Sequence, residues 1–217
     1  MRKRLSFAAF FRKDGIYFTK KHSGKMSGMW SLSTNCARNP HCIKQQGQPG
    51  TVCAHCYVNN IAKRYPAASA RWAGNTEALN NEIIPVGDWP HISKEVFRLE
   101  AFGDLQSTLQ AIHYINFSAS NPQTMFALWT KHPEYINNAL AAGYNKPENM
   151  IIIFSSFYVN KPARAPYEFI DKVFTVYGPE YARENNININ CGARNCNTCR
   201  RCYRKADGIE YVNELLK

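Results

Sequence analysis

The sequence predicts an α/β protein whose parallel strands form a partial, open β/α barrel, and three observations support this. From about residue 96, apolar segments alternate with helical segments of about 10–15 residues, a pattern typical of βαβ units. Consecutive parallel strands need right-handed crossovers, which favours a curved sheet. The chain has 217 residues, fewer than the roughly 250 of a full eight-stranded barrel, so we expect fewer repeats.

The chain suits one domain, because 45% of its residues are hydrophobic and can build a single core. Four parts are expected within residues 1–217. They are an N-terminal β-hairpin over 1–30, a first cysteine block over 31–60, the βα repeats over 96–190, and a second cysteine block with a helix over 191–217.

The first part of the chain shows short strand signals followed by helical ones. The letters RKDG separate two short apolar segments, which indicates a hairpin, and a third segment leads into the first cysteine block. These strands are expected over 6–11, 15–21 and 29–34. Helix-forming residues then cover 57–82 with a break at Pro66, because proline interrupts a helix. The letters PVGDWP that follow form a loop.

Beyond residue 96, strands and helices alternate. Runs of β-branched and aromatic residues indicate strands over 96–104, 124–131, 149–157, 172–178 and 186–190. Helices are expected over 105–120 and over 132–143, the second ended by Gly143. The segment 149–157 is the most apolar, as expected for a buried parallel strand.

The charge and the absence of targeting signals limit the function classes. The formal net charge is +11, which favours an anionic partner, most often nucleic acid or a nucleotide. A basic surface kept for solubility is the alternative. Arg12 and Lys13 interrupt the N-terminal apolar run, so we expect no secretory signal. No run approaches the roughly 20 apolar residues of a membrane span, and we expect a cytoplasmic protein without membrane contact.

Eight cysteines in a reducing compartment indicate metal binding rather than disulfides. Cysteines that follow one another at x2 spacing wrap a loop around an iron–sulfur cluster, as in ferredoxin-type loops. In the second block Cys196, Cys199 and Cys202 have this spacing, and Cys191 precedes them with four residues between it and Cys196. A [4Fe–4S] cluster is therefore expected there, with zinc as the alternative. The neighbouring cations would offset thiolate charge or contact phosphates; they are Arg194, Arg200, Arg201, Arg204 and Lys205.

The first block fits either metal by spacing alone. Its members are Cys36, Cys42, Cys53 and Cys56, and the last two form a Cys-x2-Cys chelate. His41 and His55 are possible substitute ligands. In parallel α/β folds, ligands gather outside the carboxyl ends of the strands. Because each block follows an expected strand, both are expected at one mouth of the sheet, as one shared centre or as two.

Polar residues at the expected strand ends complete the candidate site. Gly103 permits close backbone approach, and Asp104 is either a helix N-cap or a carboxylate that holds a ligand amine or acts as a base. Lys131 is either a solvated lysine or an anion-binding one, and Ser155 is better suited to bind phosphate or the backbone than to act as a nucleophile. We expect Asp104 and Lys131 to be catalytic and Gly103, Asp104 and Ser155 to contact a cofactor.

The order of these motifs resembles a known family. SLSTNC, CAHCY, LEAFGDLQS, FALWTKHP and NCGARNCNTCRRCY follow one another as in the gene-product-88-like Cys-rich proteins of bacteriophages and gut bacteria. The resemblance extends from about residue 30 onward. It implies a bacteriophage-linked protein in the host cytosol and brings no established activity.

The layout is also distantly similar to radical S-adenosylmethionine enzymes, which have a radical-SAM/TIM-like barrel. The resemblance implies cluster ligands and an adjacent aromatic at Cys42, Cys53, Cys56 and Tyr57. It also implies that Gly103 and Asp104 bind the methionine amine, and that the second block holds an auxiliary cluster. The chain departs from those enzymes in its longer spacing between Cys42 and Cys53, in Asp for Glu at 104, and in the additional Cys36.

Three hypotheses follow. The leading one is an iron–sulfur enzyme, radical-SAM-like or redox, with one or two [4Fe–4S] clusters and S-adenosylmethionine, acting on nucleic acid or a nucleotide. The second is a non-catalytic zinc protein that binds nucleic acid or blocks a host defence. A weaker third is a base-exchanging transglycosylase with Asp104 as its nucleophile.

Overall fold

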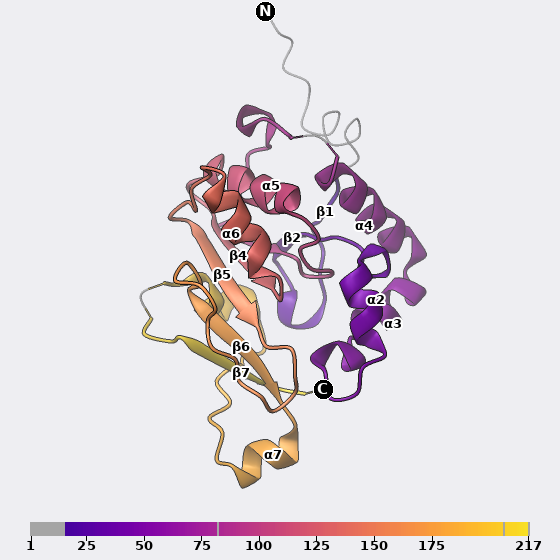
Figure 1. Ribbon diagram of the computed structural model, residues 1–217, viewed down its shortest axis with the longest axis vertical. Helices are drawn as coiled ribbons and strands as arrows, with labels where there is room; N and C mark the ends of the chain where they lie inside the picture. Colours follow the sequence, from indigo (N-terminus) through magenta and orange to yellow (C-terminus); the bar gives the residue numbers. More distant parts are fainter. Residues whose placement is uncertain (1–15, 82, 206, 217) are drawn as a thin grey trace, which may run out of the picture.

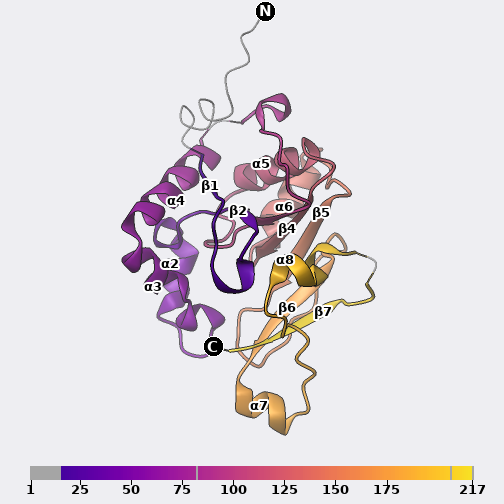
Figure 2. The same ribbon diagram turned by 180° about the vertical axis from the view of Figure 1, so that it is seen from behind.

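A computed structural model describes residues 16–81, 83–205 and 207–216 (Figures 1 and 2). The strand expected over 6–11 and the RKDG turn lie outside these residues, and the N-terminal hairpin they would form is therefore untested. The rest of the expected fold class is confirmed at the level of a mixed α/β protein with a mostly parallel sheet.

The described part of the chain contains one seven-stranded sheet, in which every strand pairs with its neighbour in chain order. The first strand is antiparallel to the second, and all the others are parallel. The strands are β1 Phe18–Thr19, β2 Trp30–Leu32, β3 Val96–Leu99, β4 Met125–Thr130, β5 Met150–Ser155, β6 Lys172–Tyr177 and β7 Tyr211–Leu215. Because the parallel strands run the same way, their carboxyl ends share one edge of the sheet.

Helices connect most of the strands. The α-helices are α2 Pro40–Gln46, α3 Val58–Arg64, α4 Pro66–Leu79, α5 Thr108–Ala119, α6 Pro133–Ala141, α7 Pro179–Glu184 and α8 Cys196–Cys199. Short 3₁₀ helices are η1 Gly24–Met26, η2 Cys36–Arg38, η3 Val52–His55, η4 Val86–Asp88 and η5 Arg201–Tyr203. The break expected at Pro66 separates α3 from α4. No helix in the described ranges is long and apolar enough to cross a membrane.

The sheet packs on both faces. In Figure 1, α5 and α6 cover the near face, and Figure 2 shows α8 against the opposite face. Phe97, Phe126 and Ile152 point into the larger core beneath α5 and α6. The alternate strand residues Ala127 and Ile153 point into a smaller core. Strands buried on both faces explain the continuous apolar runs in the sequence.

The second face brings the two ends of the described chain together. Tyr203 of η5 and Met29, which precedes β2, are both buried in the smaller core. The Asn195 side chain donates to the Ser27 carbonyl oxygen at 3.0 Å. Lys25 forms a 2.7 Å ion pair with Glu214 of β7. The β1–β2 connection therefore contacts the C-terminal segment across the sheet.

Two expectations for the C-terminal part are wrong. Residues 186–190 do not form a strand. The Asn190 side chain instead binds β7 twice, by accepting from the Asn213 amide and donating to the Tyr211 carbonyl oxygen. The helix expected within 191–217 is replaced at its end by β7, because Val212 is fully buried beside β6.

Smaller differences concern the ends and the connections. The strand expected over 15–21 is only Phe18–Thr19, and it pairs with β2. The helices α2 and α7 were not expected. Each begins with a proline at its first position. Proline is favoured there because the first backbone N–H group of a helix has no intrahelical acceptor, so its absence costs no hydrogen bond.

Candidate functional site

The first cysteine block lies at the carboxyl end of β2. Cys36 begins η2, Cys42 lies in α2, Cys53 lies in η3, and Cys56 follows η3 directly. Three N-caps fix these short segments. The side chains of Asn35, Asn39 and Thr51 accept hydrogen bonds from the first backbone amides of η2, α2 and η3, respectively. The position expected for this block, directly after a strand, is therefore the observed one.

The four thiols of this block interact with one another. Burial raises the pKa of Cys36 to about 11, and the charges of Cys56 and Cys53 add to the rise. Burial also raises the pKa of Cys42 strongly, with further contributions from Asp104, Cys53 and Cys36. The thiols are thus close enough to influence one another's ionisation.

Lys131 is the cation beside this block. Its charge opposes the rise that burial causes in the pKa of Cys42 and of Cys53. Its ammonium group donates to the Ser155 hydroxyl at 3.2 Å, which joins the loop after β4 to the end of β5. The structure therefore brings Lys131, Ser155 and the first block together at the carboxyl edge.

Asp104 connects two strand ends. It is 5% exposed. Its Oδ1 atom accepts hydrogen bonds from the Thr130 hydroxyl at 2.6 Å and from the Leu105 amide at 2.8 Å. Its Oδ2 atom accepts from the Lys131 amide at 3.1 Å. The N-cap of α5 is Ser107, so the N-cap alternative for Asp104 is wrong. Its catalytic and amine-binding roles stay predictions.

Gly103 has the backbone conformation that the turn requires. Its φ is +94°, a region that other residues rarely adopt. A Cβ atom here would lie 2.4 Å from the Thr34 hydroxyl and 2.7 Å from the Glu100 carboxylate. The glycine thus permits close packing of the loop after β3 against the loop after β2. Its expected contact with a cofactor stays a prediction.

Glu100 ends β3 inside the core and anchors the same turn. It is 3% exposed and has a φ of +53°. Its carboxylate accepts hydrogen bonds from the Tyr114 hydroxyl, the Gln110 amide group and the Thr34 amide and hydroxyl. Burial raises the pKa of Glu100 to about 8, although the hydrogen bonds from Tyr114 and Thr34 act to lower it. The group is a structural element beneath the site.

The second block lies against β7 and η1. The Cys191 amide donates to the Asn213 carbonyl oxygen at 2.9 Å, and the Asn195 side chain caps α8, which begins at Cys196 and ends at Cys199. Burial raises the pKa of Cys202 to about 12; the Arg98 charge opposes the rise, and Cys191 and Cys196 add to it. Burial likewise raises the pKa of Cys191, with contributions from Cys196 and Cys199.

One side chain is close to both blocks, and a second lies beside the second block. Desolvation of its hydroxyl raises the pKa of Tyr57, although the residue is 57% exposed; Arg98 opposes the rise, and Cys56 of the first block and Cys196 of the second both add to it. The Tyr57 hydroxyl donates to the Ala101 carbonyl oxygen at 3.2 Å. The Arg98 guanidinium lies 3.1 Å from the centroid of the Trp129 ring. Tyr57 is therefore close to both blocks, and Arg98 is close to Tyr57 and to the second block.

Sequence reasoning identified His41 but missed Arg98 and His132, the residue with which His41 pairs. The rings of His41 and His132 meet edge to face at 4.1 Å. The Nδ1 atom of His132 lies 2.7 Å from the Glu134 carboxylate. The Nε2 atoms of both histidines are buried without a hydrogen-bond partner among the described residues. Arg98 is a polar residue inside a strand, and His132 lies in the letters TKHPE. Neither pattern is distinctive in a sequence, so neither residue could be identified from it.

The thiols of the two blocks, all within the described part of the chain, do not form a metal site in their present conformation. In residues 16–81, 83–205 and 207–216, no three His, Cys, Asp or Glu side chains converge closely enough to hold a metal ion. All eight cysteines are free thiols. The side chains of each block are thus gathered but do not point at one common centre. A bound metal would require their thiols to change rotamer.

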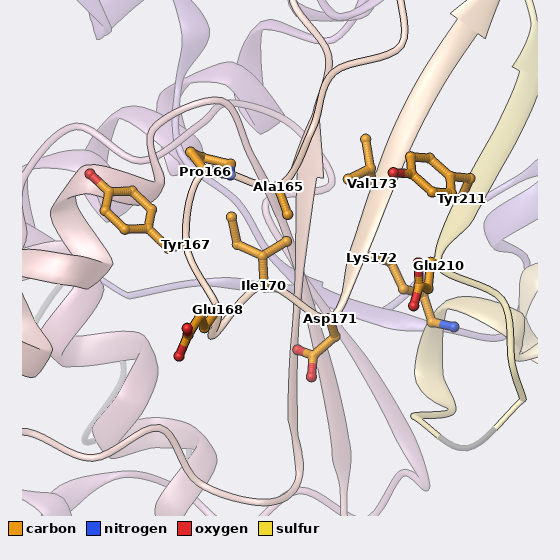
Figure 3. A pocket seen from close by; sticks show the side chains of 10 residues that line it. All are labelled: Ala165, Pro166, Tyr167, Glu168, Ile170, Asp171, Lys172, Val173, Glu210 and Tyr211. Atoms are coloured by element: carbon orange, nitrogen blue, oxygen red, sulfur yellow. The ribbon is translucent and has the colours of Figure 1, made fainter.

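A cavity of about 540 Å³ lies elsewhere, beside the amino-terminal ends of β6 and β7 (Figure 3). Ile170, Val173 and Ala165 form its apolar wall, and Glu210 and Tyr211 line the β7 side. None of the sequence-predicted site residues lines it. The candidate site is therefore the carboxyl edge of the sheet rather than this cavity.

Comparison with known proteins places the chain in a family. No curated protein and no solved structure matches it. A family model described as Gene product 88 matches residues 13–208, a range that contains both cysteine blocks, Asp104 and Lys131. Because this match covers most of the sequence, the chain belongs to the gene product 88 family.

Proposed function

We propose that this protein is an iron–sulfur enzyme with one centre in each cysteine block, acting on a nucleotide or nucleic acid at the carboxyl edge of a partial, open β/α barrel. The strand order supports the barrel, because consecutive parallel strands in chain order curve in one direction. The contacts of Lys25 with Glu214 and of Ser27 with Asn195 also support a curved sheet.

One observation carries the proposal: each block is a separate set of four interacting thiols with a cation beside it. Lys131 accompanies the first set, and Arg98 and Lys25 accompany the second. A nearby cation stabilises the thiolate, which is the form that binds metal. The spacing of the second block favours an iron–sulfur cluster over zinc.

The remaining side chains supply substrate contacts. An iron–sulfur group would supply one-electron transfer when bound. The Lys131 ammonium and the Ser155 hydroxyl are adjacent at the carboxyl edge and can donate to a phosphate or another anion. Asp104 holds the Lys131 backbone through two hydrogen bonds and so fixes the direction of that side chain. In this proposal S-adenosylmethionine is a second cofactor, and no carboxylate is assigned to its amino group, because both Asp104 oxygens already accept hydrogen bonds within the protein.

Metal and sulfide analysis of protein prepared without oxygen tests the proposal. We expect iron and acid-labile sulfide in similar amounts, with a broad visible absorption that dithionite bleaches. Lys131→Ala should keep the iron and weaken binding of a nucleotide such as ATP, measured by calorimetry. Arg183→Ala, which removes an exposed cation from α7, serves as the matched control.

Stoichiometric zinc without sulfide would overturn the iron–sulfur proposal and favour the non-catalytic zinc protein. Protein without metal and with eight thiols reactive toward Ellman's reagent would overturn both. Unchanged nucleotide binding by Lys131→Ala would overturn the role of the carboxyl edge while leaving the metal assignment in place.

A further inference from the structure

The segment that carries the first cysteine block has an unusual charge distribution. Residues 16–76 contain no Asp or Glu. The same residues contain the cations Lys20, Lys21, Lys25, Arg38, Lys44, Lys63, Arg64 and Arg71, of which Lys25 pairs with Glu214 and Arg38 with Glu77. Such a segment produces a positive potential that attracts a polyanion.

Exposed aromatic rings lie on the same part of the molecule. Tyr57 precedes α3 and is 57% exposed, and Tyr65 follows α3 and is 55% exposed. Lys63 and Arg64, at the end of α3, are exposed as well. Large exposed rings next to cations are the combination that binds bases by stacking and phosphates by charge.

A third ring joins this surface from the other side of the cysteine block. Tyr158 is 51% exposed and pairs through its backbone with Thr51, the N-cap of η3. The Val52 amide donates to the Phe157 carbonyl oxygen at 2.9 Å, which holds the two loops together. The ammonium group of Lys161 lies 5.3 Å from the Tyr158 ring centroid. We call Tyr57, Tyr65, Tyr158, Lys63, Arg64 and Lys161 the tyrosine rim.

We propose that the tyrosine rim binds a single-stranded nucleic acid, whose bases stack on the rings and whose phosphates contact the cations. The inference rests on the proposed function for its substrate class, but it requires no particular metal. A duplex fits this surface less well, because its bases are already stacked on one another and cannot reach the rings. The rim adjoins the first block, so a bound strand would pass next to Lys131 and Ser155.

Fluorescence anisotropy with a labelled oligothymidylate of about 12 nucleotides tests the inference, since single-strand sites cover about 4–16 nucleotides. The Tyr65→Ala, Tyr158→Ala double variant should bind at least about fivefold more weakly than the unmodified protein. The corresponding double Phe variant should bind normally, because phenylalanine keeps the stacking surface. The matched control is Tyr181→Ala, which removes an exposed tyrosine from α7, outside the rim.

The charge contribution is measured separately. The Lys63→Ala, Arg64→Ala double variant should lower the dependence of log K on log salt by about one to two, because each lost phosphate contact removes about one released ion. Arg183→Ala in α7 is its matched control. Metal content is determined on every sample, so that a loss of metal is not mistaken for a loss of the rim.

Equal binding by the Tyr65, Tyr158 alanine variant and the Tyr181 control would overturn the inference, as would tighter binding of a duplex of the same length. If the strand binds through the rim and no metal is found, the metal proposal fails and the rim stands. If iron and sulfide are present and the rim variants bind normally, the rim fails and the metal proposal stands.

Discussion

The Tyr114 hydroxyl donates a 2.5 Å hydrogen bond to the Glu100 carboxylate within the core beneath the candidate site. Burial raises the pKa of Glu100 from 4.5 to about 8, and the charge of Asp104 adds to the rise. Between these two values the folded protein holds a proton on Glu100 that the unfolded chain has released. The free energy of unfolding should therefore decrease as pH rises from about 4.5 to 8 because of this group.

Urea denaturation at several pH values in this window, compared with Glu100→Gln, measures the effect. His22 acts in the opposite direction, because burial, with the Arg98 charge, lowers its pKa to about 4, so its contribution increases with pH. The difference between the two proteins isolates Glu100. Between pH 4.5 and 8, the free energy of unfolding of Glu100→Gln should decrease less than that of the unmodified protein. Identical pH profiles would contradict the raised pKa of Glu100. In Glu100→Gln an NH₂ donor also replaces one of the accepting oxygens, which should lower the free energy of unfolding by about 1–3 kcal/mol.

Gly103→Ala should be strongly destabilising. The new Cβ atom would lie within 2.7 Å of the Thr34 and Glu100 side chains, in addition to the strain of a positive φ. Gly143→Ala is a matched control, because Gly143 has a φ of +93° and no atom within 4 Å of the added Cβ. The control should lose about 1 kcal/mol of the free energy of unfolding. We expect a loss at least twice as large for Gly103→Ala, measured by urea denaturation; equal losses would show that the contacts do not matter.

Periodicity predicted the central βα repeats, because β3 to β6, α5 and α6 each bury a continuous or alternating apolar pattern of their own. It failed for residues 186–190, whose alternating Ile and Asn residues imitate a strand. There the Asn190 side chain, rather than a backbone ladder, makes the bonds to β7. Strand β7 is recognisable only through its partner β6, since burial of Val212 against the sheet outweighs local preference.

The sequence predicted which types of side chain make up the candidate site, but it predicted less well how they are arranged. Cysteine spacing identified both blocks, and strand ends identified Lys131 and Ser155, because carboxyl ends of parallel strands share one edge. The position of Arg98 beside the second block depends on how the C-terminal segment folds across the sheet. That contact joins residues far apart in sequence, and no local pattern encodes it.

Asp104→Asn should lower the free energy of unfolding by about 1–3 kcal/mol. The carboxylate accepts from the Thr130 hydroxyl and from the Leu105 and Lys131 amides, and an asparagine NH₂ group would face at least one of these donors. Asp88→Asn, in the exposed η4 turn, is the matched control and should be neutral. Thermal and urea denaturation measure both. A neutral Asp104→Asn would show that the carboxylate is not a structural tie and would strengthen its candidacy as a ligand-binding group.

The two cysteine blocks should lose their metal independently. The thiols interact within each block, and the two sets lie on different elements, with Tyr57 near both and Arg98 near the second. Cys53→Ser with Cys56→Ser should therefore remove the metal of the first block and leave the second loaded. Cys199→Ser with Cys202→Ser should do the reverse.

Metal per chain, measured by plasma mass spectrometry on anaerobically prepared protein, should fall to about half in each double variant and to near zero in the combination, because a centre that loses two of its thiolates keeps too few ligands to hold metal. Loss of all metal from either double variant would show one shared centre instead of two. Circular dichroism controls for folding, since the sheet and its larger core include neither pair of thiols.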